Sequence, residues 1–196
     1  MWFVFFVELV GGYTVYLNSY EIFEPIKNYL AETPFKRNYW WYALTWNLLG
    51  TLLVLNFIKR LLKKERLKSI VKYTMITFTL IAVFLIIWRL DDFFSGFIIA
   101  LMLLSCFVIL FCIALYVMNF LSEDRILEYK KSFSLIVLGA LFIWWLVVTP
   151  IAFYEDYYNL TDPGYLRLKP LILFFNNILM YGSFSFAFLF CKPQNH

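Results

Sequence analysis

The sequence is poor in charged residues and in histidine. Only 15% of its 196 residues are Asp, Glu, Lys or Arg, whereas 63% are hydrophobic and 22% are aromatic. The apolar content of a soluble domain is nearer half, so this composition excludes an ordinary water-soluble fold. The single histidine, His196, is the last residue, which weakens any enzyme hypothesis that needs a histidine base or a zinc triad.

Cysteines and catalytic motifs are also scarce. Cys106, Cys112 and Cys191 form no Cys-x-x-Cys pair and lack the spacing of metal ligands. The sequence has no Walker loop, no Gly-x-Ser-x-Gly elbow, no His-Glu-x-x-His and no pair of intramembrane aspartates. We therefore expect no metal and no cofactor, and a protein that is not an enzyme.

Long apolar runs are the main positive feature. A bilayer core of about 30 Å needs roughly 20 apolar residues per spanning helix. Runs such as FIIALMLLSCFVILFCIALYV lack the alternation of a membrane barrel strand. The pattern predicts an all-α, polytopic transmembrane helix bundle, with residues 1–196 as a single domain. The six expected spans are Trp2–Leu17, Tyr39–Ile58, Ser69–Trp88, Phe93–Leu121, Ser132–Tyr154 and Leu171–Cys191.

The distribution of Lys and Arg predicts the orientation of these spans. If the N-terminus is cytoplasmic, the inner segments hold eleven of these residues and the outer segments hold six. The positive-inside rule therefore places both termini in the cytoplasm. Because the first apolar run lacks a basic start and contains Glu8, we expect it to be retained and not cleaved as a signal peptide.

A short charged segment separates the third and fourth spans. Four residues, Arg89–Asp92, are enough for a tight connection on the outer face, and the favoured interpretation is a solvated turn whose charges pair weakly. Trp88 fits a turn because indole prefers the membrane interface. The alternative is an outer mouth that gathers cations or a ligand through Arg89, Asp91 and Asp92.

Glu8 and three asparagines are candidate polar sites inside the spans. Glu8 is a functional candidate because ionisable groups are costly in a bilayer, although it could also lie near the cytoplasmic interface, reach a headgroup or be protonated. Asn47, Asn176 and Asn177 could bridge helices, at about 1 kcal/mol for each bond, or face a cavity.

Two deep tryptophans form a further candidate site. Trp144 and Trp145 lie about ten residues from either end of the predicted fifth span, which is too deep for an interfacial belt. Pro150 frees the backbone carbonyl of Leu146. Together with Thr149, the tryptophans could line a pocket between helices, or they could simply pack around a proline kink.

The strongest charge feature is the stretch IKRLLKKERLKSIVK. Cations recur there at four-residue spacing, so a helical connection would present one basic ridge to anionic headgroups. An acidic protein or nucleic acid is the alternative partner, but no aromatic or base-reading pattern favours nucleic acid. The basic ridge comprises Lys59, Arg60, Lys63, Lys64, Lys68 and Lys72.

Four short motifs resemble a known group of proteins. FVELVGGY, KRNYWWYALTWN, SCFVIL and NNILMYGSFSFAFLFC are similar to segments of small bacterial six-helix membrane proteins of unknown function. The size of the chain and its lack of catalytic motifs are also similar to those of membrane accessory proteins in bacterial defence systems. This resemblance implies a location in the bacterial cytoplasmic membrane and carries no catalytic residue over.

Three classes of function stay open. The favoured one is a non-enzymatic membrane protein that acts by association, as an oligomeric sensor, scaffold or effector coupled to a cytoplasmic partner. The alternatives are an ion channel or small-solute transporter, and a lipid-modifying intramembrane enzyme. We favour association because the polar content inside the spans is low for a continuous water path. The expected partners are the bilayer, anionic lipids and further copies of the chain.

Overall fold

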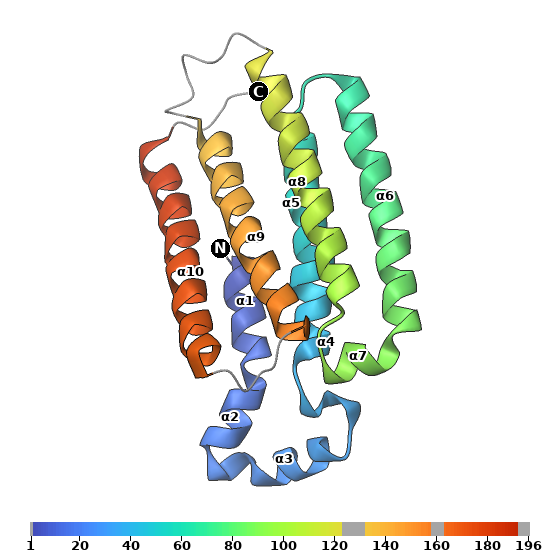
Figure 1. Cartoon of the computed structure of the whole chain (residues 1–196), viewed down its shortest axis with the longest axis vertical. Helices are drawn as coiled ribbons and strands as arrows, with labels where there is room; N and C mark the ends of the chain where they lie inside the picture. The colour runs from blue at the N-terminus through green and yellow to red at the C-terminus, as the bar shows by residue number, and fades with distance from the viewer. Residues whose placement is uncertain (1, 123–131, 158–162, 192–196) are drawn as a thin grey trace. The chain divides into compact units, whose positions relative to one another are not determined.

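Helices dominate this chain because backbone polar groups inside a bilayer can be satisfied only within a helix or a closed barrel. The computed structural model describes residues 2–122, 132–157 and 163–191, and these residues form helices and no β-strand (Figure 1). The predicted all-α class is confirmed. The helices are α1 (Trp2–Gly11), α2 (Tyr13–Ser19), α3 (Glu24–Ala31), α4 (Tyr39–Tyr42), α5 (Thr51–Leu61), α6 (Glu65–Trp88), α7 (Leu90–Ser95), α8 (Ile99–Leu121), α9 (Phe133–Tyr157) and α10 (Pro163–Phe190).

The described part of the chain also contains three helical segments that are not α-helices. Two are short 3₁₀ helices, η1 (Glu21–Phe23) and η2 (Pro34–Lys36). The third, η3 (Ala43–Gly50), is a π-helix that joins α4 to α5 without a break.

Five helical stretches of the described residues are long and apolar enough to cross a membrane. A sixth apolar helix, Phe3–Ser19, is shorter. These lengths and compositions make the chain a multi-pass integral membrane protein. The five stretches are Tyr39–Leu61, Glu65–Trp88, Ile99–Leu121, Phe133–Ile151 and Pro163–Phe190.

Two span boundaries differ by six residues or more from those predicted. Residues 90–95 form the separate helix α7, and Gly96 follows it in an extended conformation, so the next long helix begins at Ile99 and not at Phe93. The last helix begins at Pro163 and not at Leu171, so it includes the charged residues Arg167 and Lys169. At 1.5 Å per residue it is about 42 Å long. It exceeds the hydrocarbon core, which leaves room for charged turns at the interface.

The chain groups into two compact units, which we describe separately. Unit 1 comprises Met1–Val54 with Met75–Ser105, and unit 2 comprises Leu55–Thr74 with Cys106–His196. The boundaries fall inside α5, α6 and α8. The single domain expected for residues 1–196 stays a prediction.

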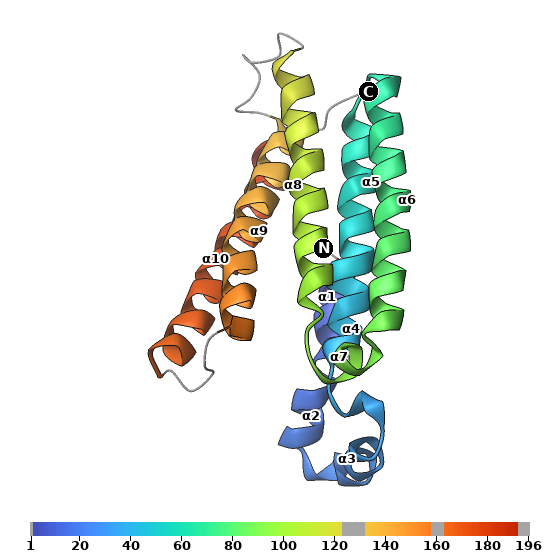
Figure 2. The same ribbon diagram turned by 45° about the vertical axis from the view of Figure 1, so that its right-hand side comes forward.

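In unit 1, α1 packs against α4, and α4 packs against α7. The chain leaves α1 through a bend at Gly12 and enters α2, which contacts α3. Figure 2 shows α2 and α3 beyond the ends of α4 and α7, with α3 lying across the direction of the long helices. Proline residues start the short elements here, since Pro25 lies in the first turn of α3 and Pro34 opens η2.

In unit 2, α9 and α10 form a closely packed hairpin. The turn between α5 and α6, the last residues of α8, the first residues of α9 and the last residues of α10 lie toward one end of this unit (Figures 1 and 2). The end of α9 and the start of α10 lie toward the other end. Helices that cross a membrane alternately produce this arrangement.

Candidate functional site

The contact between α1 and α4 is a polar site inside unit 1. Trp41 Nε1 donates to the carbonyl oxygen of Val7 at 2.9 Å, and Asn38 Nδ2 donates to the carbonyl oxygen of Gly11 at 2.7 Å. Tyr42 Oη donates to Glu8 Oε2 at 3.4 Å. Asn38 contacts Gly11, whereas Trp41, later in the chain, contacts the earlier residue Val7, so the two helices run antiparallel. We call these residues the Glu8 cluster.

Gly11 explains how Tyr42 reaches Glu8. A Cβ atom at position 11 would lie 2.7 Å from Tyr42 Oη and 3.0 Å from Trp41 Cδ1, so any larger residue would displace one of these rings. The aromatic rings also pack against each other, with Phe6 5.9 Å from Trp41 between ring centroids. Glycine therefore permits a close helix contact at this point.

The Glu8 cluster lies near one end of a span. Tyr42 is three residues after Tyr39, where the apolar stretch Tyr39–Leu61 begins, which is a rise of about 4.5 Å. In the predicted topology this is the outer end. The position of Glu8 relative to the cytoplasmic interface stays a prediction, because it depends on the orientation of the chain in the membrane.

A second layer of bonds joins this cluster to the outer segment. Tyr13 Oη lies 2.5 Å from the carbonyl oxygen of Phe35 and 2.8 Å from that of Arg37, and its single hydrogen serves one of them at a time. Trp40 Nε1 donates to Tyr13 Oη at 3.4 Å. Asn38 adds a bond to Thr14 Oγ1 at 3.3 Å. These contacts fix α2 and η2 against the start of α4.

The π-helix η3 is the second unusual feature of unit 1. Such segments leave helix carbonyls out of the regular bonding pattern and occur often at functional sites. Ser105 Oγ lies 3.1 Å from the carbonyl oxygen of Asn47 and 2.8 Å from that of Leu101. Thr51, fully buried at the end of η3, has no hydrogen-bond partner for its hydroxyl in the structure. Asn47 thus contacts Ser105 through its backbone carbonyl oxygen, whereas the sequence suggested a contact through its side-chain amide.

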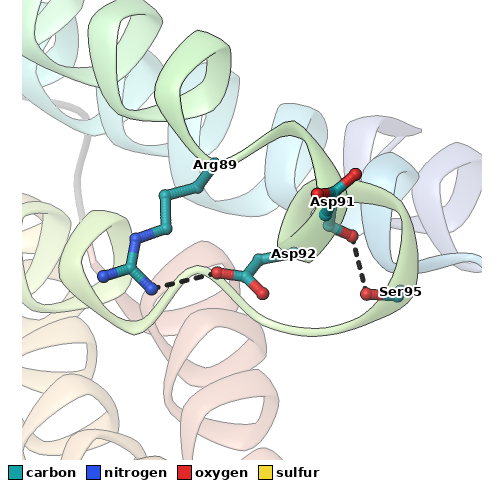
Figure 3. A network of polar contacts seen from close by, with 4 residues as sticks. All are labelled: Arg89, Asp91, Asp92 and Ser95. Carbon is teal, nitrogen blue, oxygen red and sulfur yellow. Dashed lines mark hydrogen bonds and ion pairs between the residues drawn. The ribbon is translucent and has the colours of Figure 1, made fainter.

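The charged segment between α6 and α8 is shown in Figure 3. Arg89 Nη1 and Asp92 Oδ2 form an ion pair at 3.1 Å, with 63% and 47% of their side chains exposed. Ser95 Oγ donates to the carbonyl oxygen of Asp91, and Arg37 Nη1 donates to that of Ser95 at 2.9 Å. The segment is a turn with one short helix. Its role as a mouth for cations stays a prediction.

Unit 2 brings the deep tryptophans and the paired asparagines together. Trp144 Nε1 donates to Asn177 Oδ1 at 2.8 Å, and Asn176 Nδ2 donates to the carbonyl oxygen of Trp144 at 3.2 Å. Trp145 is buried, and its carbonyl oxygen accepts a bond from Thr149 Oγ1 at 2.7 Å. The side-chain amides of Asn176 and Asn177 therefore both bind the same residue of α9, Trp144.

A cavity of about 450 Å³ lies at the connected end of α9 and α10. Trp144, Trp145 and Thr149 are not among the residues that line it, so a pocket formed by them stays a prediction. Pro150 lines this cavity. Among the described residues, those that line it are Pro150, Ile151, Tyr154, Gly164, Tyr165, Leu168, Lys169 and Ile172.

The basic segment forms a hairpin turn. The helical connection predicted for it is wrong, because α5 ends at Leu61, α6 begins at Glu65 and residues 62–64 are not helical. Leu62 is buried and anchors the turn, and the carbonyl oxygen of Lys64 accepts the first bonds of the new helix. We call this feature the basic hairpin. Its cations are Lys59, Arg60, Lys63, Lys64, Arg66, Lys68 and Lys72.

Several residues of these sites were not found from the sequence. Asn38, Trp41 and Tyr42 stand in KRNYWWYALTWN, where amide and aromatic residues crowd the start of a span. That crowding was a usable signal, but their partners on α1 depend on helix register. Ser105 is a single serine in an apolar helix and gave no signal.

Comparisons with known proteins found no relative of this chain. No protein-family model matches the chain, and neither a curated protein nor a solved structure is significantly similar to it. Within the described ranges 2–122, 132–157 and 163–191, no group of three or more His, Cys, Asp and Glu could hold a metal ion. Function must therefore be argued from the sites themselves.

Proposed function

We propose that this protein is a non-enzymatic, multi-pass membrane protein that acts by association. The basic hairpin carries the proposal, since residues 59–72 hold seven cations and one carboxylate, Glu65. Through this surface the protein binds an acidic cytoplasmic partner beside anionic lipid. It works as an oligomeric sensor, scaffold or effector in the bacterial cytoplasmic membrane, in the manner of the membrane accessory proteins of defence systems that it resembles.

The exposure of the cations supports this proposal. Arg60, Lys64 and Lys72 are exposed, and Lys68 forms an ion pair with Glu65 at 2.7 Å. Each Lys or Arg near an anionic surface contributes about 1 kcal/mol of attraction. Seven of them at a helix turn form a strong and salt-sensitive anion-binding surface. Glu65, the one carboxylate among residues 59–72, compensates for only a small part of that charge.

Exposed apolar helix faces support association between copies. Large side chains on α10, among them Phe174, Phe188 and Leu189, are 60% to 77% exposed within one chain. In a membrane such faces contact lipid or the helices of another copy. Native mass spectrometry of the full chain in lipid nanodiscs would count the subunits, and a monomer at all concentrations would contradict the oligomeric part of the proposal.

Affinity capture tests the role of the basic hairpin. The full chain and the triple variant Arg60→Gln, Lys64→Gln, Lys72→Gln are reconstituted in nanodiscs of neutral lipid and incubated with cytoplasmic extract. We expect at least one specific protein whose recovery falls about tenfold or more with the variant and falls with added salt, since three charges are lost. The control Arg167→Gln alters a cation outside the hairpin and leaves recovery unchanged.

A partner that binds the triple variant as well as the parent chain would contradict the proposed surface. Neutral lipid in the nanodiscs separates protein capture from lipid binding. Repeating the assay with vesicles of anionic lipid and no extract measures the lipid contribution alone. If only that signal depends on the hairpin, the surface serves membrane orientation and the association proposal fails.

The π-helix supports a second candidate function, a channel or small-solute transporter. Irregular helix bonding at membrane depth is tolerated where it is covered by protein or lines a path. In unit 1 the buried hydroxyl of Thr51 lies on the first residue of α5, directly after η3, and that of Ser105 lies beside η3. Flux of ions or dye through protein in sealed liposomes, compared with Glu8→Gln and Ser105→Ala, tests this candidate. Protein-dependent flux that changes in either variant would favour transport over association.

A further inference from the structure

Among the described residues, those that line the cavity at the connected end of α9 and α10 are mainly apolar, and one of them, Lys169, is cationic. Ile151, Leu168 and Ile172 supply aliphatic surface from both helices, and Lys169 supplies the charge. Its volume, about 450 Å³, is within the range of small-molecule sites. This combination fits a molecule with an apolar chain and an anionic head.

Two tyrosines give the cavity a fixed wall. The rings of Tyr154 and Tyr165 lie 4.6 Å apart between centroids, one from each helix. Tyr165 Oη donates to the carbonyl oxygen of Ile151 at 3.1 Å, one residue after Pro150. The hydroxyl thereby ties the start of α10 to the end of α9. The cavity is therefore built by contacts across the hairpin, and it is not simply a gap between side chains.

The position of the cavity along the helices places it at a membrane interface. The apolar run of α9 continues to Tyr154 in the sequence, and α10 is 28 residues long, about 12 Å more than the hydrocarbon core requires. Arg167 and Lys169 lie in the first turns of α10, so the excess length lies at this end. Tyrosine is enriched at such interfaces. An apolar chain in the cavity would point toward the hydrocarbon, and Lys169 would stand at headgroup level.

We infer that this cavity is a binding site for an anionic phospholipid of the outer leaflet. The phosphate of the headgroup pairs with the ammonium group of Lys169, and the first part of an acyl chain lies on Ile151, Leu168 and Ile172. The site is at the end of unit 2 opposite the basic hairpin, so it does not depend on the proposed partner binding. A bound lipid would fill the space between the two helix ends and stabilise the hairpin.

Photocrosslinking of the full chain in phosphatidylcholine vesicles tests this inference. The vesicles contain a small fraction of a photoreactive phosphatidylglycerol, or of a photoreactive phosphatidylcholine with the same acyl chains. After illumination, mass spectrometry locates the labelled peptides. We expect phosphatidylglycerol to label residues 150–154 and 164–172 about fivefold more than phosphatidylcholine, the effect of one cation near a lipid headgroup.

Two matched pairs of variants separate the headgroup contact from the chain contact. Lys169→Gln removes the preference for phosphatidylglycerol, whereas Arg167→Gln, on the same helix but outside the cavity lining, keeps it. Leu168→Trp fills the cavity and lowers labelling by both lipids. Leu166→Trp is the control, because Leu166 is as exposed as Leu168, 54% against 56%, but does not line the cavity.

Several results would overturn the inference. These are equal labelling by the two lipids, a preference that survives Lys169→Gln, labelling unaffected by Leu168→Trp, and displacement of the lipid by inorganic phosphate. Each variant is first checked for the elution volume and melting temperature of the parent. If Leu168→Trp does not fold, Ile172→Trp fills the same cavity from the next turn of α10 and takes its place.

Discussion

At the scale of single residues, Gly11 controls the approach of two aromatic rings to α1. A membrane helix gains no hydrophobic stabilisation from contact with another helix, so packing and a few polar bonds decide which helices associate. Gly11 permits the close packing. Glu8, less than one turn away on α1, accepts a hydrogen bond from Tyr42, and Asn38 donates one to the carbonyl oxygen of Gly11. A single change at this glycine therefore alters both kinds of contact.

Replacing Gly11 with alanine should destabilise the protein. The added Cβ would lie 2.7 Å from Tyr42 Oη, so the ring must move and its bond to Glu8 is lost. We expect the free energy of unfolding to fall by about 1–3 kcal/mol, the usual cost of overpacking. Gly139→Ala is the control, because no atom lies within 4 Å of a Cβ there. Reversible unfolding in mixed micelles compares the two variants, and equal stability would contradict the close contact.

Neutralising Arg89 should change stability very little. Its ion pair with Asp92 is exposed, and exposed pairs contribute about 0–1 kcal/mol. We expect Arg89→Gln to lower the melting temperature by no more than a few degrees and to leave flux in liposomes unchanged. A large loss of stability, or altered cation flux, would instead support the outer mouth formed by Arg89, Asp91 and Asp92. Lys36→Gln, another exposed cation outside the spans, is the matched control.

At the scale of elements, the bonds from Trp144 to two successive asparagines hold α9 against α10. Successive residues on a helix project about 100° apart, yet one partner is the indole nitrogen of Trp144 and the other is its backbone carbonyl oxygen. The two bonds define both the distance and the rotation of the helices. The second bond also gives the buried side chain of Asn176 a hydrogen-bond partner, because a buried amide without one is costly.

A double-mutant cycle should detect this link. Combining Trp144→Phe with Asn177→Leu should show a coupling energy of about 0.6–1.7 kcal/mol, the range found for hydrogen bonds between membrane helices. The effects of Ile143→Ala and Asn177→Leu should instead add, because no bond joins these residues. Unfolding in mixed micelles gives the four free energies. Additivity in the first cycle would show that the bond contributes nothing to stability.

Elements were predictable from the sequence where local composition decides them. The helix Ile99–Leu121 is apolar on every face, so it forms in lipid whatever its neighbours. Features that depend on contacts between distant residues were not predictable. Tyr42 meets Glu8 across 34 positions, and Ser105 reaches Asn47 across 58. The expected basic helix is interrupted at residues 62–64, where Leu62 is buried, and a regular spacing of lysines could not reveal this turn.

At the scale of the whole molecule, the distribution of charge predicts the orientation in the membrane. The excess of Lys and Arg is carried mainly by the basic hairpin, and the positive-inside rule counts such short segments most strongly. The two functional proposals depend on this orientation in opposite ways. The basic hairpin must face the cytoplasm to bind its partner, and the cavity beside Lys169 must then face the outer leaflet.

Thiol accessibility in intact cells tests the orientation directly. With the parent cysteines replaced by serine, we expect Lys64→Cys to react with a membrane-impermeant maleimide only after the cells are permeabilised, whereas Lys27→Cys and Arg167→Cys react without permeabilisation. All three side chains are exposed, so accessibility reports the side of the membrane and not burial. The reverse pattern would invert the topology and move the cavity of unit 2 to the cytoplasmic leaflet. Partial labelling of every site in intact cells would mean that the cation bias is too weak to orient the chain.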